Sequence, residues 1–328
     1  MMKIALVVLS VILAATVAGA ALAFDPATVN SANYDENFSA DDWGIKRPDA
    51  VVLKLQIMLD RAHFSPGLID GHMGENTEHA LREFEKRSGL PADGRLDREA
   101  WNALSQGMPK VLVTYEVTKE DVAGPFAASI PEDYAAMADM DSLSYTSAAE
   151  LLAEKFHIDI ELLRMLNPDA RLEKPGEEIT VPNVADVAPE GEVERIEIDK
   201  TKGVVRGYDP DGAVVVVYPA SIGSDVNPSP TGKMSVKGVA RNPKYSYRPD
   251  KNFQQQGNDE PLTLPPGPNG PVGSIWIDLT KETYGIHGTA DPEIIGKTSS
   301  HGCVRLTNWD AQQLGRLVKP GTKVSFVE

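Results

Sequence analysis

The stretch YGIHGTADPEIIGKTSSHGCVRLTNWDAQQL, residues 284–314, gathers the side chains best suited to chemistry in this chain. Its basic, nucleophilic and cationic members are His287, Ser300, His301, Cys303 and Arg305. A thiol at its ordinary pKa of about 8.5 is only slightly ionised at neutral pH, although the thiolate is the nucleophile. A neighbouring imidazole can hold the thiol's proton and later return it to a leaving amine. The stretch therefore predicts nucleophilic catalysis by Cys303.

The neighbours of the cysteine fit the same chemistry. Gly302 permits a strained turn and close approach of a peptide backbone, and its surroundings can offer N–H groups to an oxyanion. Arg305 can grip a carboxylate with two parallel hydrogen bonds. Two other interpretations remain. One is a zinc site made by His287, His301 and Cys303, although the sequence nearby offers no fourth ligand and no paired-cysteine spacing. The other is a purely structural cluster, in which packed histidines surround a buried thiol.

Several motifs in this region carry a family resemblance. They are His287-Gly288-Thr289, Ile295-Gly296, the seven residues SHGCVRL from Ser300 to Leu306, and GPNGPVGSIWIDL at 267–279. Together they resemble the catalytic domain of the L,D-transpeptidases, the YkuD-like family. Pro230-Thr231-Gly232-Lys233 is similar to that family's Thr-Pro-x-Gly turn, with Thr and Pro exchanged. The resemblance covers residues 193–328 and implies a mainly-β domain.

This resemblance implies a role for each site residue. Cys303 would attack the carbonyl of the L-centre of a diamino acid, at position three of a wall stem tetrapeptide, and expel the terminal D-alanine. His287 would be the general base and acid, Ser300 and His301 would shape the site, and the backbone at Gly302 and Cys303 would form the oxyanion hole. The expected substrate-binding residues are Arg305, Gly288, Tyr284 and Trp276. The resemblance implies no metal or organic cofactor, and carbapenem-type inhibitors are expected to acylate Cys303.

Three functions compete for this site. An amine from a second stem peptide could resolve the thioester and form a cross-link, which is L,D-transpeptidation. Water could resolve it instead, which is L,D-carboxypeptidation. The third alternative is a non-catalytic wall-binding protein that has kept the fold, although the intact Cys303 and His287 argue against it. The motif does not separate the first two, because the choice depends on acceptor access and exclusion of water.

The amino terminus indicates export. Met1-Met2-Lys3 precedes the apolar run Ile4–Gly19, and Ala21-Leu22-Ala23 follows, so residues 1–23 are typical of a cleaved secretory signal peptide. The alternative is a retained anchor, but the run is short for the roughly 20 residues of a membrane-spanning helix. No later stretch is apolar enough to span a bilayer, so no stable membrane span is expected after cleavage. We expect a location in the periplasm or the cell wall.

Composition excludes some classes of partner. The formal net charge of -16 would repel a phosphate backbone, so nucleic acid is not an expected partner. Cys303 is the single cysteine of the chain, which therefore has no internal disulfide. A lone thiol in an oxidising compartment risks oxidation, and its presence there favours a chemical role.

The next part of the chain predicts a small helical domain. Residues 24–48 are polar and without clear periodicity, so a flexible leader is expected there. Residues 49–108 predict three helices, and the string LQIMLDRAHFSPGLIDGHMGENTEHALREFEKRSGLPADGRLDREAWNAL at 55–104 resembles the three-helix peptidoglycan-binding domain. The resemblance implies binding to wall glycan. A spacer domain is the alternative, because most matched residues are turn glycines and apolar core residues.

Residues 111–184 predict a strand, two helices and a final strand. That outline resembles a divergent LysM module, a small α+β unit that would bind glycan. Two features depart from the pattern: Glu120-Asp121 stands where Gly-Asp is common, and roughly Val122 to Thr146 is extra sequence between the first strand and the helices. His157, near the break between the helices, is interpreted as a turn residue rather than a ligand.

The predicted fold class is thus multidomain. A three-helix peptidoglycan-binding domain would be followed by a small α+β LysM-like module and a mainly-β L,D-transpeptidase catalytic domain. Within residues 193–328 the alternating apolar pattern predicts strands at 193–198, 203–208, 214–218, 274–279 and 323–327, and a helix at 308–317. Proline and glycine are dense from Pro228 to Gly273, which predicts long loops that carry function.

Overall fold

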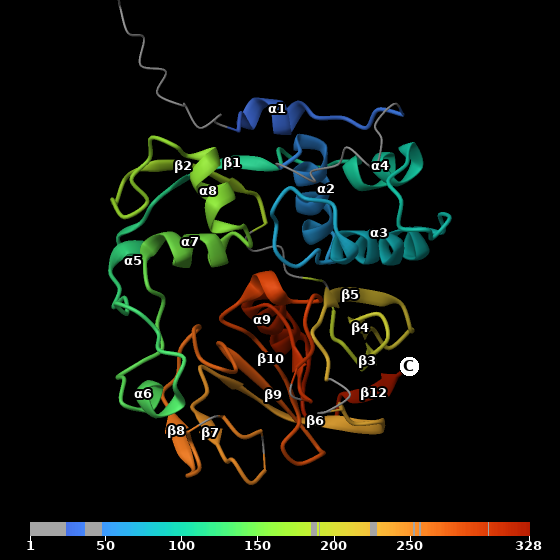
Figure 1. The fold of residues 1–328 in the computed structure, drawn as a ribbon. Coiled ribbons are helices and arrows are strands. Elements are labelled where there is room, and N and C mark those ends of the chain that lie inside the picture. Colours follow the sequence, from blue (N-terminus) through green and yellow to red (C-terminus); the bar gives the residue numbers. More distant parts are fainter. Residues whose placement is uncertain are drawn as a thin grey trace, which may run out of the picture.

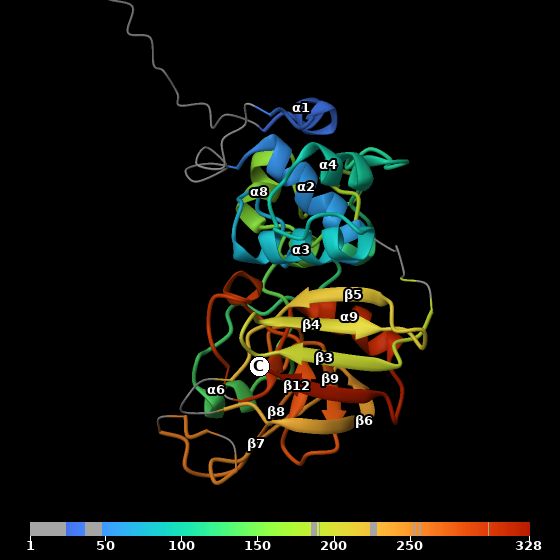
Figure 2. The same ribbon diagram turned by 90° about the vertical axis from the view of Figure 1, so that its right-hand side faces the viewer.

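The fold is seen in a computed structural model that describes residues 24–36, 48–184, 189, 191–223, 228–251, 253–255, 257–300 and 302–328. The predicted signal peptide at 1–23 and the predicted site residue His301 lie outside the described residues. Within the described part of the chain, no helix is both long and apolar enough to cross a membrane. Figure 1 shows a mainly helical layer lying above a sheet-rich part, and Figure 2 shows the same two layers from the side.

The N-terminal helical unit is built from α2 (Ala50–Arg61), α3 (Glu75–Ser88) and α4 (Arg98–Ser105). Asp49 starts α2 by accepting hydrogen bonds from the backbone N–H groups of Val51 and Val52. Gly89 ends α3 in the left-handed conformation, with a φ of 70°. The helices bury their apolar faces in a shared core that includes Leu55, Leu81 and Trp101.

Residues 24–36 do not form the flexible leader that was expected there. They contain α1 (Pro26–Ser31), which lies across the helical layer, with Val29 fully buried. Its Asn30 side chain exchanges two 3.0 Å hydrogen bonds with the backbone of Leu112, and Lys54 Nζ donates to the Asn30 carbonyl at 2.9 Å. The polar composition of this segment concealed these contacts, because side chains that bind backbone groups leave no apolar periodicity.

The central unit comprises β1 (Leu112–Glu116), α5 (Lys119–Val122), α6 (Tyr134–Ala138), α7 (Ala148–Lys155), α8 (Ile160–Leu166) and β2 (Glu178–Pro182). Strands β1 and β2 pair antiparallel and bring the ends of the unit together. His157 lies in the turn between α7 and α8 with a φ of 57°, as a turn residue would. The likeness to a LysM module stays a prediction.

The C-terminal part is an eight-stranded sheet in the order β11-β10-β9-β6-β12-β3-β4-β5. Its strands are β3 (Arg195–Asp199), β4 (Val204–Tyr208), β5 (Val214–Pro219), β6 (Gly232–Arg241), β9 (Ile275–Leu279), β10 (Gly285–His287), β11 (Val304–Arg305) and β12 (Lys323–Val327). Helix α9 (Asn308–Leu317) packs on β9 and β10, and β7 (Tyr245–Tyr247) pairs with β8 (Leu262–Leu264) as a separate hairpin. The long strand β6 joins the two halves of the sheet, pairing with β12 and with β9.

The helical unit is fixed to the edge of this sheet at β5. The Val217 N–H donates to the His63 carbonyl, and the Ser65 N–H donates to the Val217 carbonyl, each at 2.9 Å. Arg206 Nη2 lies 2.6 Å from Glu83 Oε1 of α3, with both side chains at most 7% exposed. The two backbone hydrogen bonds cover part of the free edge of β5, which would otherwise expose unpaired backbone groups, and the ion pair attaches α3 to β4.

Candidate active site

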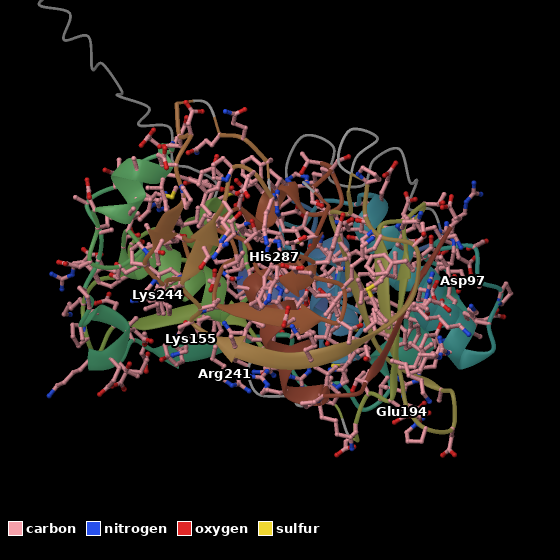
Figure 3. The ribbon with its side chains drawn as sticks, turned by 90° about the horizontal axis from the view of Figure 1, so that it is seen from below. Asp97, Lys155, Glu194, Arg241, Lys244 and His287 are labelled. Carbon is pink, nitrogen blue, oxygen red and sulfur yellow. The ribbon has the colours of Figure 1, made fainter. Side chains whose placement is uncertain are left out.

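The cysteine and the histidine are brought together by two short parallel strands. In the register of β10 and β11, Ile286 lies beside Val304 and His287 beside Arg305, so Cys303 immediately precedes the paired segment. His287, Cys303, Arg305 and Ser300 all line one cavity of about 500 Å³. Seen from below, His287 lies near the middle of the sheet-rich part (Figure 3). The chain thus gathers a thiol, an imidazole and a guanidinium around one space.

The His287 ring is held in one orientation. It is 5% exposed, and it stacks on Trp276 with ring centroids 5.7 Å apart. Its Nδ1 lies 2.7 Å from the Gly288 carbonyl oxygen. Because a carbonyl only accepts hydrogen bonds, Nδ1 carries the proton and Nε2 keeps its lone pair. Burial, and secondarily the charge of Arg305, lowers the pKa of His287 to about 4, so the ring is neutral at physiological pH and available as a base.

Cys303 is half-buried, and its Sγ lies 3.6 Å from the Thr283 carbonyl oxygen. Burial raises the pKa of the Cys303 thiol, while a backbone hydrogen bond from Gly285 and the charge of Arg305 act in the opposite direction. The resting site therefore holds a neutral thiol and a neutral imidazole. Such a pair transfers the proton as the sulfur attacks, rather than storing a thiolate beforehand.

Ser300 and Gly302 shape the turn that presents the sulfur. The Ser300 hydroxyl donates to the Cys303 carbonyl and accepts from the Gly302 N–H at 3.2 Å. The Ser229 hydroxyl donates to the Gly302 carbonyl at 2.7 Å, and Gly302 has a φ of 108°. Because the Gly302 N–H already binds Ser300, the N–H of Cys303 is the better placed of the two to hold an oxyanion.

The predicted substrate-binding residues do not all face the cavity. Arg305, Tyr284 and Trp276 line it, whereas Gly288 is not in its described wall. Gly288 is instead pressed against Asn308, whose Oδ1 would lie 2.1 Å from a Cβ at this position. Substrate binding by Gly288 stays a prediction, but this glycine also has structural contacts of its own. It allows Asn308 to approach and supplies the carbonyl that orients His287.

A metal site finds little support among the described residues. They contain no group of three or more His, Cys, Asp or Glu side chains arranged to hold a metal ion. The zinc alternative included His301, which is outside the described residues, so its full ligand set stays untested.

Comparison with known proteins agrees with the geometry. Residues 194–325 match the family model of the L,D-transpeptidase catalytic domain (YkuD), and residues 48–104 match that of a putative peptidoglycan binding domain. The chain carries an L,D-transpeptidase catalytic domain. Three of the similar proteins each cover part of the chain.

The putative L,D-transpeptidase YkuD of Bacillus licheniformis is 29% identical over 179 residues, which are 54% of this chain and 92% of that protein. The putative L,D-transpeptidase YkuD of Bacillus subtilis is 33% identical over 113 residues, 34% of this chain and 54% of that protein. L,D-transpeptidase 3 from Mycobacterium tuberculosis, in its crystal structure, is 17% identical, covers 47% of this chain and 76% of its own, and gives a TM-score of 0.35. That score is low, so the family assignment rests on sequence.

Asn308 is a buried polar residue next to Gly288 that the sequence analysis did not single out. It is fully buried at the start of α9, and its Oδ1 accepts from the Ser274 N–H at 2.9 Å. Its Nδ2 donates to Glu154 Oε2 at 2.9 Å and to the Pro268 carbonyl at 3.1 Å. Asn308 thus links α7 of the central unit to the loop behind His287. The only indication of Asn308 in the sequence was its position directly after Thr307, the residue that caps the start of α9.

The transpeptidase cavity also has walls that no motif indicated. Tyr245 of β7 and Phe253 of the following loop line it, as do Tyr134 and Met137 of α6. The last two belong to the central unit and lie more than 150 positions before Cys303. Only the tertiary structure places them at the site, because nothing in the local sequence around them has a catalytic pattern.

Proposed function

We propose that this protein is a peptidoglycan L,D-transpeptidase that links stem peptides through a thioester on Cys303. The observation that carries the proposal is the cavity that Cys303, His287 and Arg305 line together. The contact of His287 Nδ1 with the Gly288 carbonyl leaves the Nε2 lone pair free to act as the base. The match of residues 194–325 to the transpeptidase catalytic domain supports the same conclusion.

The proposed acylation step follows from these groups. Cys303 Sγ forms a bond to the carbonyl carbon of the third stem residue while its proton passes to His287 Nε2. The Cys303 N–H holds the oxyanion of the tetrahedral intermediate. The amide bond to D-alanine then breaks, and the leaving amine takes the proton from His287. Arg305 binds a carboxylate of the donor stem peptide in two parallel hydrogen bonds.

In the second step an amine of a neighbouring stem peptide attacks the thioester carbonyl. Its proton passes through His287 to the departing sulfur, so the thiol is regenerated and an amide cross-link is formed. No metal or organic cofactor enters either step. Water attacking the same thioester would give L,D-carboxypeptidation, and the products distinguish the two outcomes.

The accompanying domain supports a location at the wall. Residues 48–104 match a putative peptidoglycan binding domain, and we propose that this domain holds the enzyme on wall glycan. Export by the predicted signal peptide would place the protein in the periplasm or the cell wall, where its substrate lies.

Purified protein incubated with a disaccharide tetrapeptide, followed by mass spectrometry, tests the proposal. Dimers that have lost one D-alanine are the expected product, and Cys303→Ala should form none. Tripeptide alone would show a carboxypeptidase. An unchanged substrate with the wild-type protein would refute the enzymatic assignment.

Carbapenems provide a second test of the nucleophile. We propose that a carbapenem acylates Cys303, because its strained amide presents the same kind of carbonyl to the thiol. The intact mass of the wild-type protein should increase by the mass of the inhibitor, while that of Cys303→Ala stays unchanged. An adduct on the variant would place the nucleophile elsewhere.

A further inference from the structure

Helix α6 lies apart from the rest of the central unit. Residues between α5 and α7 leave the helical layer, and α6 lies next to β7 and β8 of the sheet-rich part in both Figure 1 and Figure 2. Contacts between α6 and β8 confirm the proximity. The extra sequence noted between Val122 and Thr146 therefore extends from the central unit to the transpeptidase domain.

Hydrogen bonds attach this segment to the loops beside the active site. The Tyr134 N–H donates to Gln255 Oε1 at 2.8 Å, and Gln255 Nε2 donates to the Glu132 carbonyl at 2.8 Å. Leu143 donates its N–H to the Pro266 carbonyl at 2.9 Å, and its own carbonyl accepts from the Asn269 N–H at 3.0 Å. Such paired contacts at both ends hold the segment in one register against the transpeptidase domain.

The backbones approach so closely that one position requires glycine. A Cβ on Gly267 would lie 2.0 Å from the Leu143 carbonyl oxygen, and the φ of Gly267 is 154°. The start of the 267–279 segment, which resembles a family motif, therefore also serves as the docking surface for a segment from the central unit.

The docked segment shares a small apolar core with the β7–β8 hairpin. Tyr134, Met137 and Leu143 are buried with Tyr247 and Leu264, separately from the main core of the sheet. The Tyr134 ring packs edge-to-face on Tyr247, with ring centroids 5.2 Å apart. The Tyr134 ring is therefore fixed in place before any substrate arrives.

Tyr134 and Met137 also line the catalytic cavity with Cys303, His287 and Arg305. Burial raises the pKa of Tyr134 to about 12, while the nearby Arg305 charge acts to lower it, so the phenol stays neutral near pH 7. A neutral phenol beside a guanidinium offers a hydrogen-bond donor next to a positive charge, and a carboxylate accepts from both. Met137 adds a flexible apolar surface beside them.

We propose that Tyr134 and Met137, supplied by the central unit, are specificity-determining residues that bind the donor stem peptide in the transpeptidase cavity. The Tyr134 hydroxyl and Arg305 together bind a carboxylate of the donor, and Met137 packs on its aliphatic side-chain carbons. The inference rests on the proposed transpeptidase function. It makes the central unit part of the substrate site rather than only an attachment module.

Steady-state release of D-alanine from the disaccharide tetrapeptide tests this role in the full-length protein. Tyr134→Phe removes only the hydroxyl and should raise KM about tenfold, the loss expected for one hydrogen bond to a charged group, with kcat changed by less than about twofold. Met137→Ala should raise KM severalfold. Met140→Ala is the matched control, because Met140 packs against the same small core but is not in the described cavity wall.

Alkylation of Cys303 by iodoacetamide shows whether the thiol itself is disturbed. This small reagent does not need the stem-peptide contacts, so its rate should be the same in all three variants and the wild type. A KM unchanged in Tyr134→Phe would overturn the inference, as would an equal rise in Met140→Ala or an altered alkylation rate. Wild-type protein that releases no D-alanine would overturn the proposed function itself, which distinguishes the two failures.

Discussion

The Glu154 carboxyl, buried between the central unit and the transpeptidase domain, should make the stability of this protein fall as pH rises. Its Oε2 accepts from Asn308 Nδ2 at 2.9 Å and its Oε1 accepts from the Tyr145 hydroxyl at 2.5 Å. Burial raises the pKa of Glu154 from 4.5 to about 7, against the effect of these two hydrogen bonds. The folded protein thus keeps a proton on Glu154 that the unfolded chain has already released.

The sign and size of the effect follow from this difference in pKa. Between pH 4.5 and 7 the folded state binds more protons than the unfolded state, so the free energy of unfolding decreases as pH rises. Each pH unit corresponds to about 1.4 kcal/mol, so the full contribution of Glu154 is about 3 kcal/mol. It is fully present below pH 4.5 and lost above about pH 7.

The variant Glu154→Gln isolates this contribution. The amide oxygen can accept from Asn308, and the amide nitrogen can donate to the Tyr145 hydroxyl, so the contacts survive without an ionisable group. Urea unfolding at pH 5 and pH 8 should show a loss of stability in the wild type that exceeds the loss in the variant by about 2.5 kcal/mol, because the unfolded chain is already partly ionised at pH 5. Glu161→Gln, an exposed change on α8, should behave as the wild type.

Equal pH dependence in the wild type and Glu154→Gln would refute this reasoning. It would mean that water reaches the carboxyl, or that the interface between α7 and α9 opens before the protein unfolds. Asp310, whose pKa is also raised by burial to about 7, contributes to both proteins and therefore cancels in the comparison.

Three further predictions follow from the site and the interface. The rate of carbapenem acylation, measured by stopped flow, should show no titration near pH 6.5, because the pKa of His287 is lowered to about 4. A change in rate with a midpoint between pH 6 and 7 would contradict a neutral imidazole acting as the base. Ser300→Ala removes the hydroxyl that binds the Gly302 N–H and the Cys303 carbonyl, so it should lower kcat by roughly 10- to 100-fold with little change in KM. An unchanged kcat would show that the turn keeps its shape without the hydroxyl. Glu83→Ala leaves the buried Arg206 with only its partners in the sheet, so it should lower the free energy of unfolding in urea by about 3 kcal/mol. A loss below about 1 kcal/mol would mean that Asp199 and Glu197 are enough to neutralise the guanidinium.

The catalytic residues were predicted from local sequence because their chemistry depends on residue type and short spacing. Cys303, Arg305 and Ser300 lie within six positions, and any fold that makes the turn at Gly302 keeps them close. The three helices expected within residues 49–108 followed from apolar periodicity, and they correspond to α2, α3 and α4. These signals are local, so no tertiary information was needed to interpret them.

Other features were not accessible in this way. The packing of α1 arises from the Asn30 side chain bonding to the backbone of Leu112, which no hydrophobic pattern records. The motif around Gly288 likewise gave no sign of Asn308, whose Oδ1 would lie 2.1 Å from a Cβ at that position. Both cases depend on which distant group occupies the adjacent space.

The sequence by itself predicted the nucleophile and the base and indicated the family of the catalytic domain, because a reactive thiol needs particular neighbours along the chain. Only the tertiary structure decided that the Tyr134 segment of the central unit closes one wall of the catalytic cavity. That arrangement depends on hydrogen bonds and apolar contacts between residues more than 100 positions apart, such as Leu143 and Pro266. Contacts of this kind form only when the chain has folded, and they leave no repeating pattern in the sequence.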